Sequence, residues 1–523
     1  MIYNLVNPNA DNREADIVII GGGTVGLMMS VLLAREHGIS VICLESGAHE
    51  QLDEEHHLND VVHSKSFYSG AVQGRFRCLG GTSTRWGGAL IPFLKRDIQN
   101  AKWPIHYESL TEFIPELEQL FELNNGAYDD LLLMNDLGMK NHVPRLAKWP
   151  PFRKRNVFNL FSKEVKSKSG PEVWVNATVV EFLTNATELH TIIAKSPNGN
   201  KLKVTGKKFI FAAGAIETTR LALLLDRQND NIISKVSPAL GSYFCDHLST
   251  EVATIVTNST NKLNKIFGFR FEKGGVMRNL RFELSENCEI RKLIPPCFAH
   301  VGFSTDFQGG FDYLREIYKH LQQNKLPHIR LIANLTLSAP WLFKAIWWRF
   351  IEKRLVFPAS AQLILHMVIE QVPYESSQIS LSEEKLDVYG QPLAQIDWTV
   401  SDKDIDNLNK ATNYFLDSWN SSTIRNCAKI IPMAPSFIAK NLKLWGEFYH
   451  PTGSTRMSDK AENGVVDRNL RIFALPNTYL LSTASFPTGG GTNPTMMLLL
   501  LGLKCVKELK NVLGDKTKTD NLT

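Results

Sequence analysis

The chain has 523 residues, of which 43% are hydrophobic, and its 58 basic residues exceed its 53 acidic residues by only five. A chain of this kind can bury a large core and is long enough for two or more domains, which excludes a disordered or fibrous protein. The excess positive charge is spread out without a long basic run, which argues against a nucleic-acid-binding protein.

Two features predict the compartment. The seven cysteines are scattered without a C-x-x-C pair, which predicts reduced, buried thiols and no metal site. Residues 1–15 lack the apolar core of a secretory signal, and the longest apolar run, 496–503, is far shorter than the roughly 20 residues that span a bilayer. We therefore expect a cytoplasmic protein, at most peripheral to the inner face of a membrane.

The first element along the chain is a βαβ unit. Residues 16–20 form an apolar, β-branched run typical of a parallel strand, and a glycine turn, a helix and a second strand follow over 21–47. Mixed strands and amphipathic helices over 245–447 indicate a separate domain. The other predicted elements are β-rich stretches at 173–182 and 207–213, helices at 216–225, 404–419 and 494–513, and strands at 363–373 and 391–400.

Gly21, Gly23 and Gly26 form the pattern G-x-G-x-x-G between the first strand and the helix. The first glycine permits the tight turn, the second lets the backbone approach a pyrophosphate, and the third lets the helix pack on the strand. Glu45 closes the second strand, where a carboxylate would bind ribose hydroxyls and disfavour the 2′-phosphate of NADP. The pattern alone does not separate FAD from NAD.

Two further clusters carry possible chemistry. Residues 79–88, LGGTSTRWGG, contain four glycines and three hydroxyl residues, which suits backbone laid against a planar ligand but equally suits a plain glycine loop. His450 and Asn493 stand at the edges of two Gly-rich turns near the C-terminus. A histidine can take the proton of an alcohol and an asparagine can hold its oxygen, although a lone histidine is more often structural.

Taken together, these segments resemble the glucose-methanol-choline (GMC) oxidoreductase family and occur in the family's order. Weaker matches lie between them, at 103–107, 212–217 and 241–247. The resemblance implies an α/β fold with a Rossmann-like FAD-binding domain and a second, sheet-based α+β substrate domain. We assign 14–100, 165–250 and 448–513 to the FAD domain, and 101–164 and 251–447 to the substrate domain and cap elements.

The resemblance also implies roles for individual residues. His450 matches the family's catalytic base and Asn493 its partner. Arg85 stands where some members carry the histidine bonded to the flavin, so we predict non-covalent FAD. Thr483 stands where many members carry an acidic residue, next to the predicted flavin contacts of Ala484 and Ser485. The full predicted cofactor set is Gly21, Gly23, Gly26, Glu45, Gly80, Gly81, Thr82, Ser83, Trp86, Gly87, Gly88, Val179, Ala213, Gly214, Ala484, Ser485, Asn493, Pro494 and Thr495, with Gly87 near the reactive face of the flavin.

The implied activity is oxidation of an alcohol to a carbonyl, with His450 taking the proton and the hydride passing to flavin N5. The Asn493 pairing favours a sugar, glycoside or cyclitol hydroxyl, with a hydrophobic or sterol-like alcohol as the alternative. We expect a dehydrogenase rather than an oxidase, with oxygen or another acceptor reoxidising the flavin. A lyase on the same fold, a nicotinamide-dependent enzyme and a non-catalytic flavin-binding protein stay open.

Residues 340–354 form a basic, aromatic-rich segment with two readings. An amphipathic helix of this composition can lie on a membrane surface or bind a partner. It can also pack its aromatic side chains into the substrate domain. We favour the packed helix, because the apolar residues fall on more than one of its faces.

Overall fold

The computed structural model describes residues 1–7, 12–51, 55–101, 103–286, 288–305 and 309–520. Residues 8–11 of the N-terminal stretch judged against a secretory signal lie outside this range. Within it, no helix is both long and apolar enough to cross a membrane. All seven cysteines are free and six of them are buried, which confirms the prediction of unpaired thiols.

The glycine turn belongs to a nine-stranded sheet. Its order is β1-β6-β3-β2-β9-β19-β18, and β8 also pairs with β9 and carries β7 on its other edge. The pairs from β1 to β19 along this path are parallel. The strands are β1 (Ile2–Asn4), β2 (Arg13–Ile20), β3 (Val41–Leu44), β6 (Glu172–Val175), β7 (Thr178–Thr184), β8 (Leu189–Lys195), β9 (Lys201–Phe211), β18 (Arg471–Ile472) and β19 (Leu475–Leu480). The predicted βαβ unit is confirmed as β2, α1 (Thr24–Ala34) and β3.

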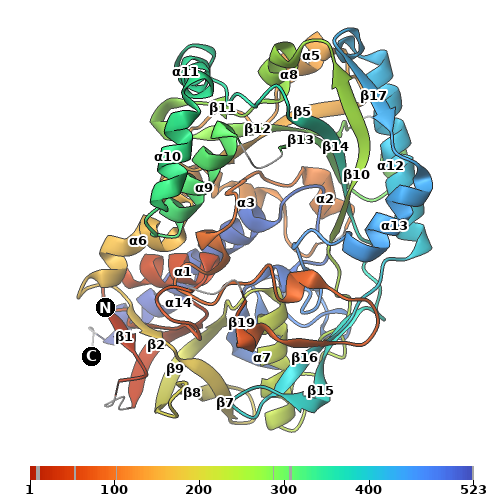
Figure 1. The fold of residues 1–523 in the computed structure, drawn as a ribbon. Helices are drawn as coiled ribbons and strands as arrows, with labels where there is room; N and C mark the ends of the chain where they lie inside the picture. Colours follow the sequence, from red (N-terminus) through yellow and green to blue (C-terminus); the bar gives the residue numbers. More distant parts are fainter. Residues whose placement is uncertain (8–11, 52–54, 102, 287, 306–308, 521–523) are drawn as a thin grey trace.

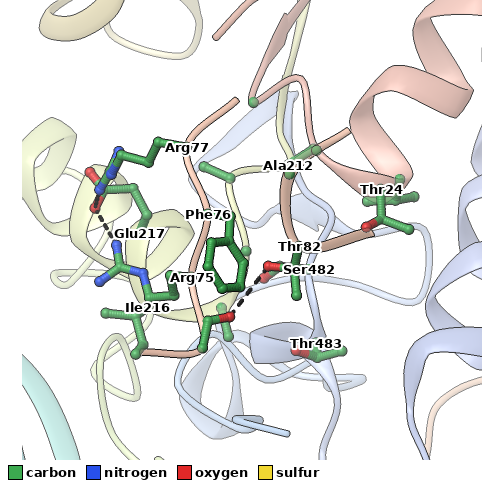
Figure 2. Close-up of a pocket in the computed structure, with 18 of the residues that line it drawn as sticks. Thr24, Arg75, Phe76, Arg77, Thr82, Ala212, Ile216, Glu217, Ser482 and Thr483 are labelled. Atoms are coloured by element: carbon green, nitrogen blue, oxygen red, sulfur yellow. Dashed lines mark hydrogen bonds and ion pairs between the residues drawn. The ribbon is translucent and has the colours of Figure 1, made fainter. Parts of the chain in front are cut away.

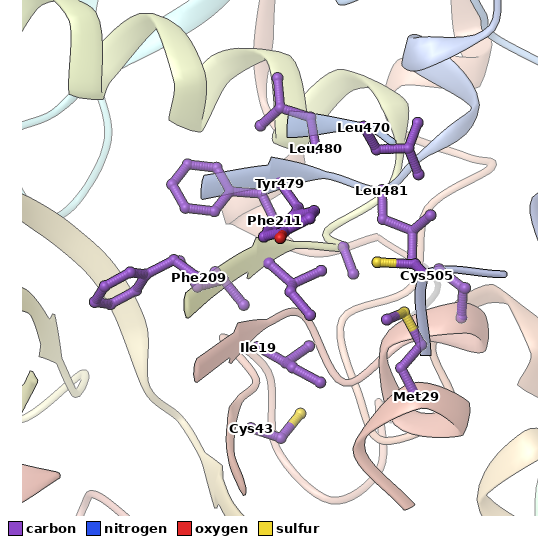
Figure 3. Packing of buried hydrophobic residues seen from close by; sticks show 14 of the residues in the cluster. Ile19, Met29, Cys43, Phe209, Phe211, Leu470, Tyr479, Leu480, Leu481 and Cys505 are labelled. Atoms are coloured by element: carbon purple, nitrogen blue, oxygen red, sulfur yellow. The ribbon is translucent and has the colours of Figure 1, made fainter. Parts of the chain in front are cut away.

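Helices cover this sheet and close its core. Helix α1 packs against α14 (Thr495–Asp520), and α7 (Ala215–Gln228) lies on the other side of the strands (Figure 1). Figure 3 shows Met29 of α1 and Cys505 of α14 in the same cluster as Ile19 and Phe211 of the central strands. All four side chains are almost fully buried, so the ends of β2 and β9 are held rigidly beneath the glycine turn.

A second, antiparallel sheet lies above the first in Figure 1, in the order β11-β12-β13-β14-β10-β17 with β5 beside β12. Helices α12 (Asp402–Ser421) and α13 (Pro435–Trp445) cover it, and Ser401 and Asp404 cap the start of α12 reciprocally. The predicted strand 363–373 and helix 404–419 are confirmed. The strands are β5 (His142–Trp149), β10 (His247–Thr257), β11 (Arg270–Phe271), β12 (Met277–Leu284), β13 (Cys297–Ser304), β14 (Gln362–Glu370) and β17 (Ala428–Pro432).

A small third sheet joins β15 (Gln378–Leu386), β16 (Pro392–Asp397) and β4 (Val61–His63), and it packs on α7. Strand β16 confirms the prediction at 391–400. The domain boundaries given above stay a prediction. The remaining described α-helices are α2 (Lys95–Gln99), α3 (Glu108–Thr111), α4 (Ile114–Leu120), α5 (Leu131–Leu137), α6 (Val157–Lys166), α8 (Thr260–Phe267), α9 (Gly310–Gln322), α10 (Ile329–Leu337) and α11 (Ala339–Trp347), the last continuing into a π-turn at Trp348–Glu352.

The packed reading of residues 340–354 is wrong for most of its aromatic side chains. Phe343, Trp347 and Phe350 are 73%, 60% and 69% exposed, whereas Trp348 is buried. Helix α11 packs mainly on α9, α10 and its own π-turn. Two helical neighbours cannot cover a helix whose apolar residues lie on several faces, so the remaining faces stay exposed.

Candidate active site

The turn between β2 and α1 has the geometry that its three glycines predict. Gly21 has φ +110°, and a Cβ there would lie 2.6 Å from the carbonyl oxygen of Ala212. A Cβ on Gly26 would lie 2.0 Å from the carbonyl oxygen of Gly21, so the helix and the turn touch through backbone alone. A Cβ on Gly23 would meet nothing within 4 Å, and Gly23 lines a large cavity. The turn therefore presents bare backbone and the start of α1 to this cavity.

Glu45 follows β3 and lines the same cavity. Its carboxylate accepts hydrogen bonds from the Gly22 amide at 2.8 Å and the Gly47 amide at 2.9 Å. Burial raises the pKa of this carboxyl, and the two amides partly offset the effect. The position beside the glycine turn is the one expected for a carboxylate that binds ribose hydroxyls.

The segment 79–88 only partly faces the cavity. The cavity is lined by Gly81, Thr82 and Ser83, which belong to the short helix Gly81–Thr84, and by Trp86. The ends of the segment pack elsewhere: a Cβ on Gly80 would meet Asn156, one on Gly87 the ring of Trp149, and one on Gly88 the side chain of Arg155. Gly80, Gly87 and Gly88 therefore do not line this cavity, and their contact with the cofactor stays a prediction.

The opposite wall comes from three other segments. Val179, Ala213 and Gly214 line the cavity as predicted, and so do Pro494 and Thr495 at the start of α14. Gly26 lies behind the turn rather than in the wall, and Asn493 reaches the site through His450.

Ala484 and Ser485 do not line this cavity, and their contacts with the flavin stay a prediction. Both residues are fully buried, in the short helix Thr483–Ser485. The Ala484 amide donates to Ser482 Oγ at 3.2 Å and the Ser485 amide to the Ser482 carbonyl at 3.1 Å, so neither points into the cavity. The lining of this stretch comes instead from Leu481, Ser482 and Thr483. The turn folds its amides back on Ser482.

A charged cluster that sequence reasoning missed forms one side of the cavity (Figure 2). Glu217, in the first turn of α7, pairs with Arg77 at 2.7 Å, with Arg75 at 3.0 Å and with Arg220 at 3.0 Å. Burial alone would raise the pKa of Glu217, but the three guanidinium groups lower it overall. Arg75 and Arg77 lie six and four residues before the Gly81 turn, and no motif marked them.

His450 lines the far end of this cavity and lies between two side chains. Its Nε2 is 3.1 Å from Asn493 Nδ2, and its Nδ1 is 3.2 Å from His247 Nδ1. His247 Nε2 is 2.7 Å from the carbonyl oxygen of Gly490. An Arg281 guanidinium nitrogen lies 2.5 Å from Asn493 Oδ1. The predicted pair His450 and Asn493 thus meets directly, and His247 and Arg281 join it from β10 and β12.

These contacts assign the protons of the network. The Gly490 carbonyl can only accept, so His247 Nε2 carries a hydrogen. Burial lowers the pKa of His247 to about 4, so its Nδ1 is an unprotonated acceptor near neutral pH. His450 Nδ1 must then donate, which leaves a lone pair on His450 Nε2. Arg281 donates to Asn493 Oδ1 and thereby turns the amide nitrogen of Asn493 towards that lone pair.

Asp246 fixes the backbone beneath both histidines. Its carboxylate accepts hydrogen bonds from the amides of His247 and His450 at 2.7 Å each, and from Tyr68 Oη at 2.7 Å. Burial raises the pKa of Asp246 to about 7, although these hydrogen bonds work against the shift. The stretch 241–247 was visible in the sequence as a weak family match, but it gave no chemical role to Asp246 or His247.

The residues present fit a dinucleotide cofactor. One cavity runs from the glycine turn, past Glu45 and Ala213, to His450. At one end the start of α1 offers amide groups and a positive dipole to a pyrophosphate. Gly214 has φ +77° and, like Gly23, leaves the space above its backbone open. His450, whose unprotonated Nε2 accepts a hydrogen bond from the Asn493 amide, lines the same cavity.

Comparison with known proteins places this site in a family. A family model described as GMC oxidoreductase matches residues 373–502, the stretch that carries His450 and Asn493. The 2-methyl-1,2-propanediol dehydrogenase of Mycolicibacterium austroafricanum is 19% identical over 94% of this chain and 94% of its own. The fructose dehydrogenase large subunit of Gluconobacter japonicus is 20% identical over 96% and 98%. The chain is thus similar to GMC oxidoreductases, through the family model over residues 373–502 and through these two relatives over almost its whole length.

Solved structures of similar proteins share the fold of this chain. A formate oxidase from Aspergillus oryzae RIB40, studied for the modification of its FAD, gives a TM-score of 0.62 at 13% identity, over 97% of this chain and 100% of that one. A pyridoxine 4-oxidase from Mesorbium loti gives 0.59 at 12% identity, over 94% and 99%. These likenesses confirm the predicted fold class, and the match to the GMC oxidoreductase model indicates FAD as the cofactor.

The glycine turn between β2 and α1 offers a matched pair of substitutions. We expect Gly23→Ala to fold normally, because its φ is −78° and the added Cβ meets nothing, yet to weaken FAD binding about tenfold or more by crowding the phosphate. Gly26→Ala should instead cost about 1–3 kcal/mol of stability, since its Cβ would overlap the Gly21 carbonyl. FAD titration and urea unfolding of both variants measure the two effects. Equal stability losses in the two would contradict the assignment.

Proposed function

We propose that the chain oxidises the CH–OH group of a small polyhydroxylated alcohol, such as a sugar, glycoside or cyclitol, to a carbonyl. The observation that carries this proposal is the unprotonated His450 Nε2, aimed beside the Asn493 amide at the end of the cavity that begins at the glycine turn. Bound FAD supplies the hydride acceptor.

The chain's own residues supply proton transfer and positioning. His450 accepts the hydroxyl proton of the substrate at Nε2, and Asn493 donates to the same oxygen through its amide nitrogen. His247 accepts the hydrogen bond from His450 Nδ1 and thereby fixes the plane of the His450 ring. Arg281 fixes the orientation of the Asn493 amide. A base held in this way typically contributes about 10²–10⁴-fold to the rate.

The substrate class rests on the polar surroundings of the base. Asn493 contacts His450, Arg281 contacts Asn493 Oδ1, and Arg281 also contacts Thr492 Oγ1 at 2.5 Å, so an amide, a guanidinium and a hydroxyl form one hydrogen-bonded chain that begins at His450. Such groups suit a substrate with several hydroxyls better than a sterol-like alcohol. The names of the two relatives above, a diol dehydrogenase and a fructose dehydrogenase, agree with this class.

The proposed function is tested by anaerobic bleaching of the purified yellow holoenzyme against a panel of sugars, cyclitols, diols and hydrophobic alcohols. We expect bleaching by a polyhydroxylated member, followed by faster reoxidation with a quinone than with oxygen if the chain is a dehydrogenase. Turnover of a substrate without bleaching would show a lyase, and loss of yellow colour on gel filtration with retained NAD would show a nicotinamide enzyme.

We expect the FAD to be bound without a covalent bond. Arg85 replaces the histidine that attaches flavin in some relatives, and its guanidinium lies over Phe76 and donates to the Gln51 carbonyl. Acid precipitation of the holoenzyme should release all flavin into the supernatant, where its absorbance is measured. Yellow colour that stays with the protein pellet would contradict this expectation.

The pH dependence of kcat/KM should report His450. Burial, and next His247 and Arg281, lower its pKa well below the usual histidine value of about 6.5, so the free base persists at mildly acidic pH. We expect kcat/KM to fall only below pH 6.5, as His450 takes a proton. His247→Ala removes one cause of the pKa shift, so the acidic limb of the kcat/KM profile of this variant should move up towards pH 6.5.

Asp246 also titrates in this range, since its pKa is about 7. The Asp246→Asn variant identifies any limb that belongs to Asp246 rather than to His450. An acidic limb that stays at one pH in both the wild-type enzyme and His247→Ala would contradict the role given to His247.

A further inference from the structure

Helices α10 and α11 form the most exposed apolar surface of the described chain. Neither helix contains a fully buried residue, although most of their side chains are apolar. The two helices lie at the upper left edge of the molecule in Figure 1, where they pack on α9 and on each other. We call the following residues, all at least 46% exposed, the cap surface: Leu326, Ile329, Ile332, Leu337, Phe343, Ile346, Trp347, Phe350 and Ile351.

The cap surface is strongly basic. Residues 325–354 contain six lysines and arginines and a single acidic residue, Glu352. Glu352 is itself paired with Lys265 at 2.9 Å. Soluble monomers rarely expose so many large apolar side chains together, and such a patch usually marks an interaction site. Because this patch is positively charged, we expect its partner to be anionic.

A pocket at the end of the π-turn concentrates that charge. It is lined by Arg270, Phe271, Glu272, Lys273, Arg349, Phe350, Lys353 and Arg354. Among the described residues, the ion pairs include Arg270 with Asp130 and Glu272 with Arg278, and none of them involves Lys273, Arg349, Lys353 or Arg354. Burial and the neighbouring Arg270 lower the pKa of Arg354, as expected for cations held close together.

Phe350 connects the two features. It belongs to the cap surface and also lines the pocket, and Arg349 beside it lies 3.8 Å above the ring of Phe271. Exposed aromatic and aliphatic side chains therefore stand directly next to a pocket of unpaired cations. A ligand with a phosphate at one end and an apolar group at the other would fill the cationic pocket and cover the exposed apolar side chains.

We propose that the cap surface docks on an anionic phospholipid bilayer, with its apolar side chains in the interface and a lipid phosphate in the basic pocket. Helices with a basic face and exposed Trp, Phe and Leu side chains bind membrane interfaces in this way. A second copy of the chain fits poorly, because a symmetric contact would bring six cations against six. The protein lies on the bilayer rather than in it, since no described helix is long and apolar enough to cross.

Vesicle flotation of the holoenzyme tests the proposal. We expect binding to vesicles that contain phosphatidylglycerol and far weaker binding to pure phosphatidylcholine, with the difference reduced at high salt. The double variants Phe343→Ser/Trp347→Ser and Arg349→Glu/Lys353→Glu should each lower the partition coefficient at least about tenfold. Both change exposed or unpaired side chains, so flavin content and melting temperature should stay at wild-type values.

Matched controls lie at the opposite end of the molecule, in the β15–β16 hairpin (Figure 1). Val388→Ser and Lys385→Glu remove an equally exposed apolar side chain and an exposed cation there, and both should bind like the wild-type protein. The proposal is overturned if the protein does not bind vesicles, if it binds neutral vesicles equally well, or if the control variants lose as much vesicle binding as the double variants. A dimer in light scattering that dissociates in Phe343→Ser/Trp347→Ser would show instead that the cap surface joins two copies.

Discussion

Replacing His450 by alanine is expected to lower the rate of flavin reduction by substrate about 10²–10⁴-fold, while FAD stays bound. The substitution removes the lone pair that accepts the hydroxyl proton, but the glycine turn and Glu45 remain as they are. Anaerobic stopped-flow mixing with substrate measures the reduction rate, and the flavin spectrum of the purified variant measures its occupancy. Reduction at the wild-type rate would remove His450 from the mechanism.

The Asn493→Ala variant separates proton transfer from orientation. Asn493 only holds the substrate oxygen and the His450 ring, so its loss should slow reduction less than loss of His450. Because the two side chains share one hydrogen bond at 3.1 Å, their effects should not add in the double variant. Fully additive losses would show that His450 and Asn493 act separately.

The parts of the fold that follow from local pattern were predicted correctly. The βαβ unit, β14, β16 and α12 each have a continuous apolar or amphipathic period. Strand β5 was missed, because Arg145 and Lys148 interrupt its apolar pattern. In the structure both are buried and paired, Arg145 with Glu283 at 2.9 Å and Lys148 with Glu118 at 2.5 Å. Those partners lie 138 and 30 residues away, so no local pattern reveals them.

The candidate site also contains residues that local spacing locates and residues that only tertiary contacts bring together. Gly21, Gly23 and Glu45 act through one turn and its neighbouring strand, so their spacing alone locates them. His247 and Arg281 reach His450 only because β10 and β12 belong to one sheet that stands over the first. The sequence contains these residues without any spacing that ties them to His450. Their roles follow from tertiary contacts.

Replacing Glu217 by alanine is expected to lower the free energy of unfolding by about 3–5 kcal/mol and to reduce FAD occupancy. The change leaves Arg75, Arg77 and Arg220 close together with their shared carboxylate gone, and only Arg220 retains another acidic partner, Asp387, among the described residues. Urea unfolding of the holoenzyme measures the loss. Glu383→Ala removes an exposed glutamate and should change stability by less than about 0.5 kcal/mol.

The Glu217→Gln variant tests whether charge or shape carries this effect. Glutamine keeps the volume and one acceptor, but it cannot neutralise three guanidinium groups. Because the folded pKa of Glu217 lies below its unfolded value, its charge stabilises the protein above the usual glutamate range, and that contribution is lost as pH falls. The stability gap between wild type and Glu217→Gln should therefore narrow in acid. If this difference in stability stays constant with pH, the Glu217 cluster stabilises the protein through packing rather than through charge. The cavity wall would then depend on how α7 packs and not on its ion pairs.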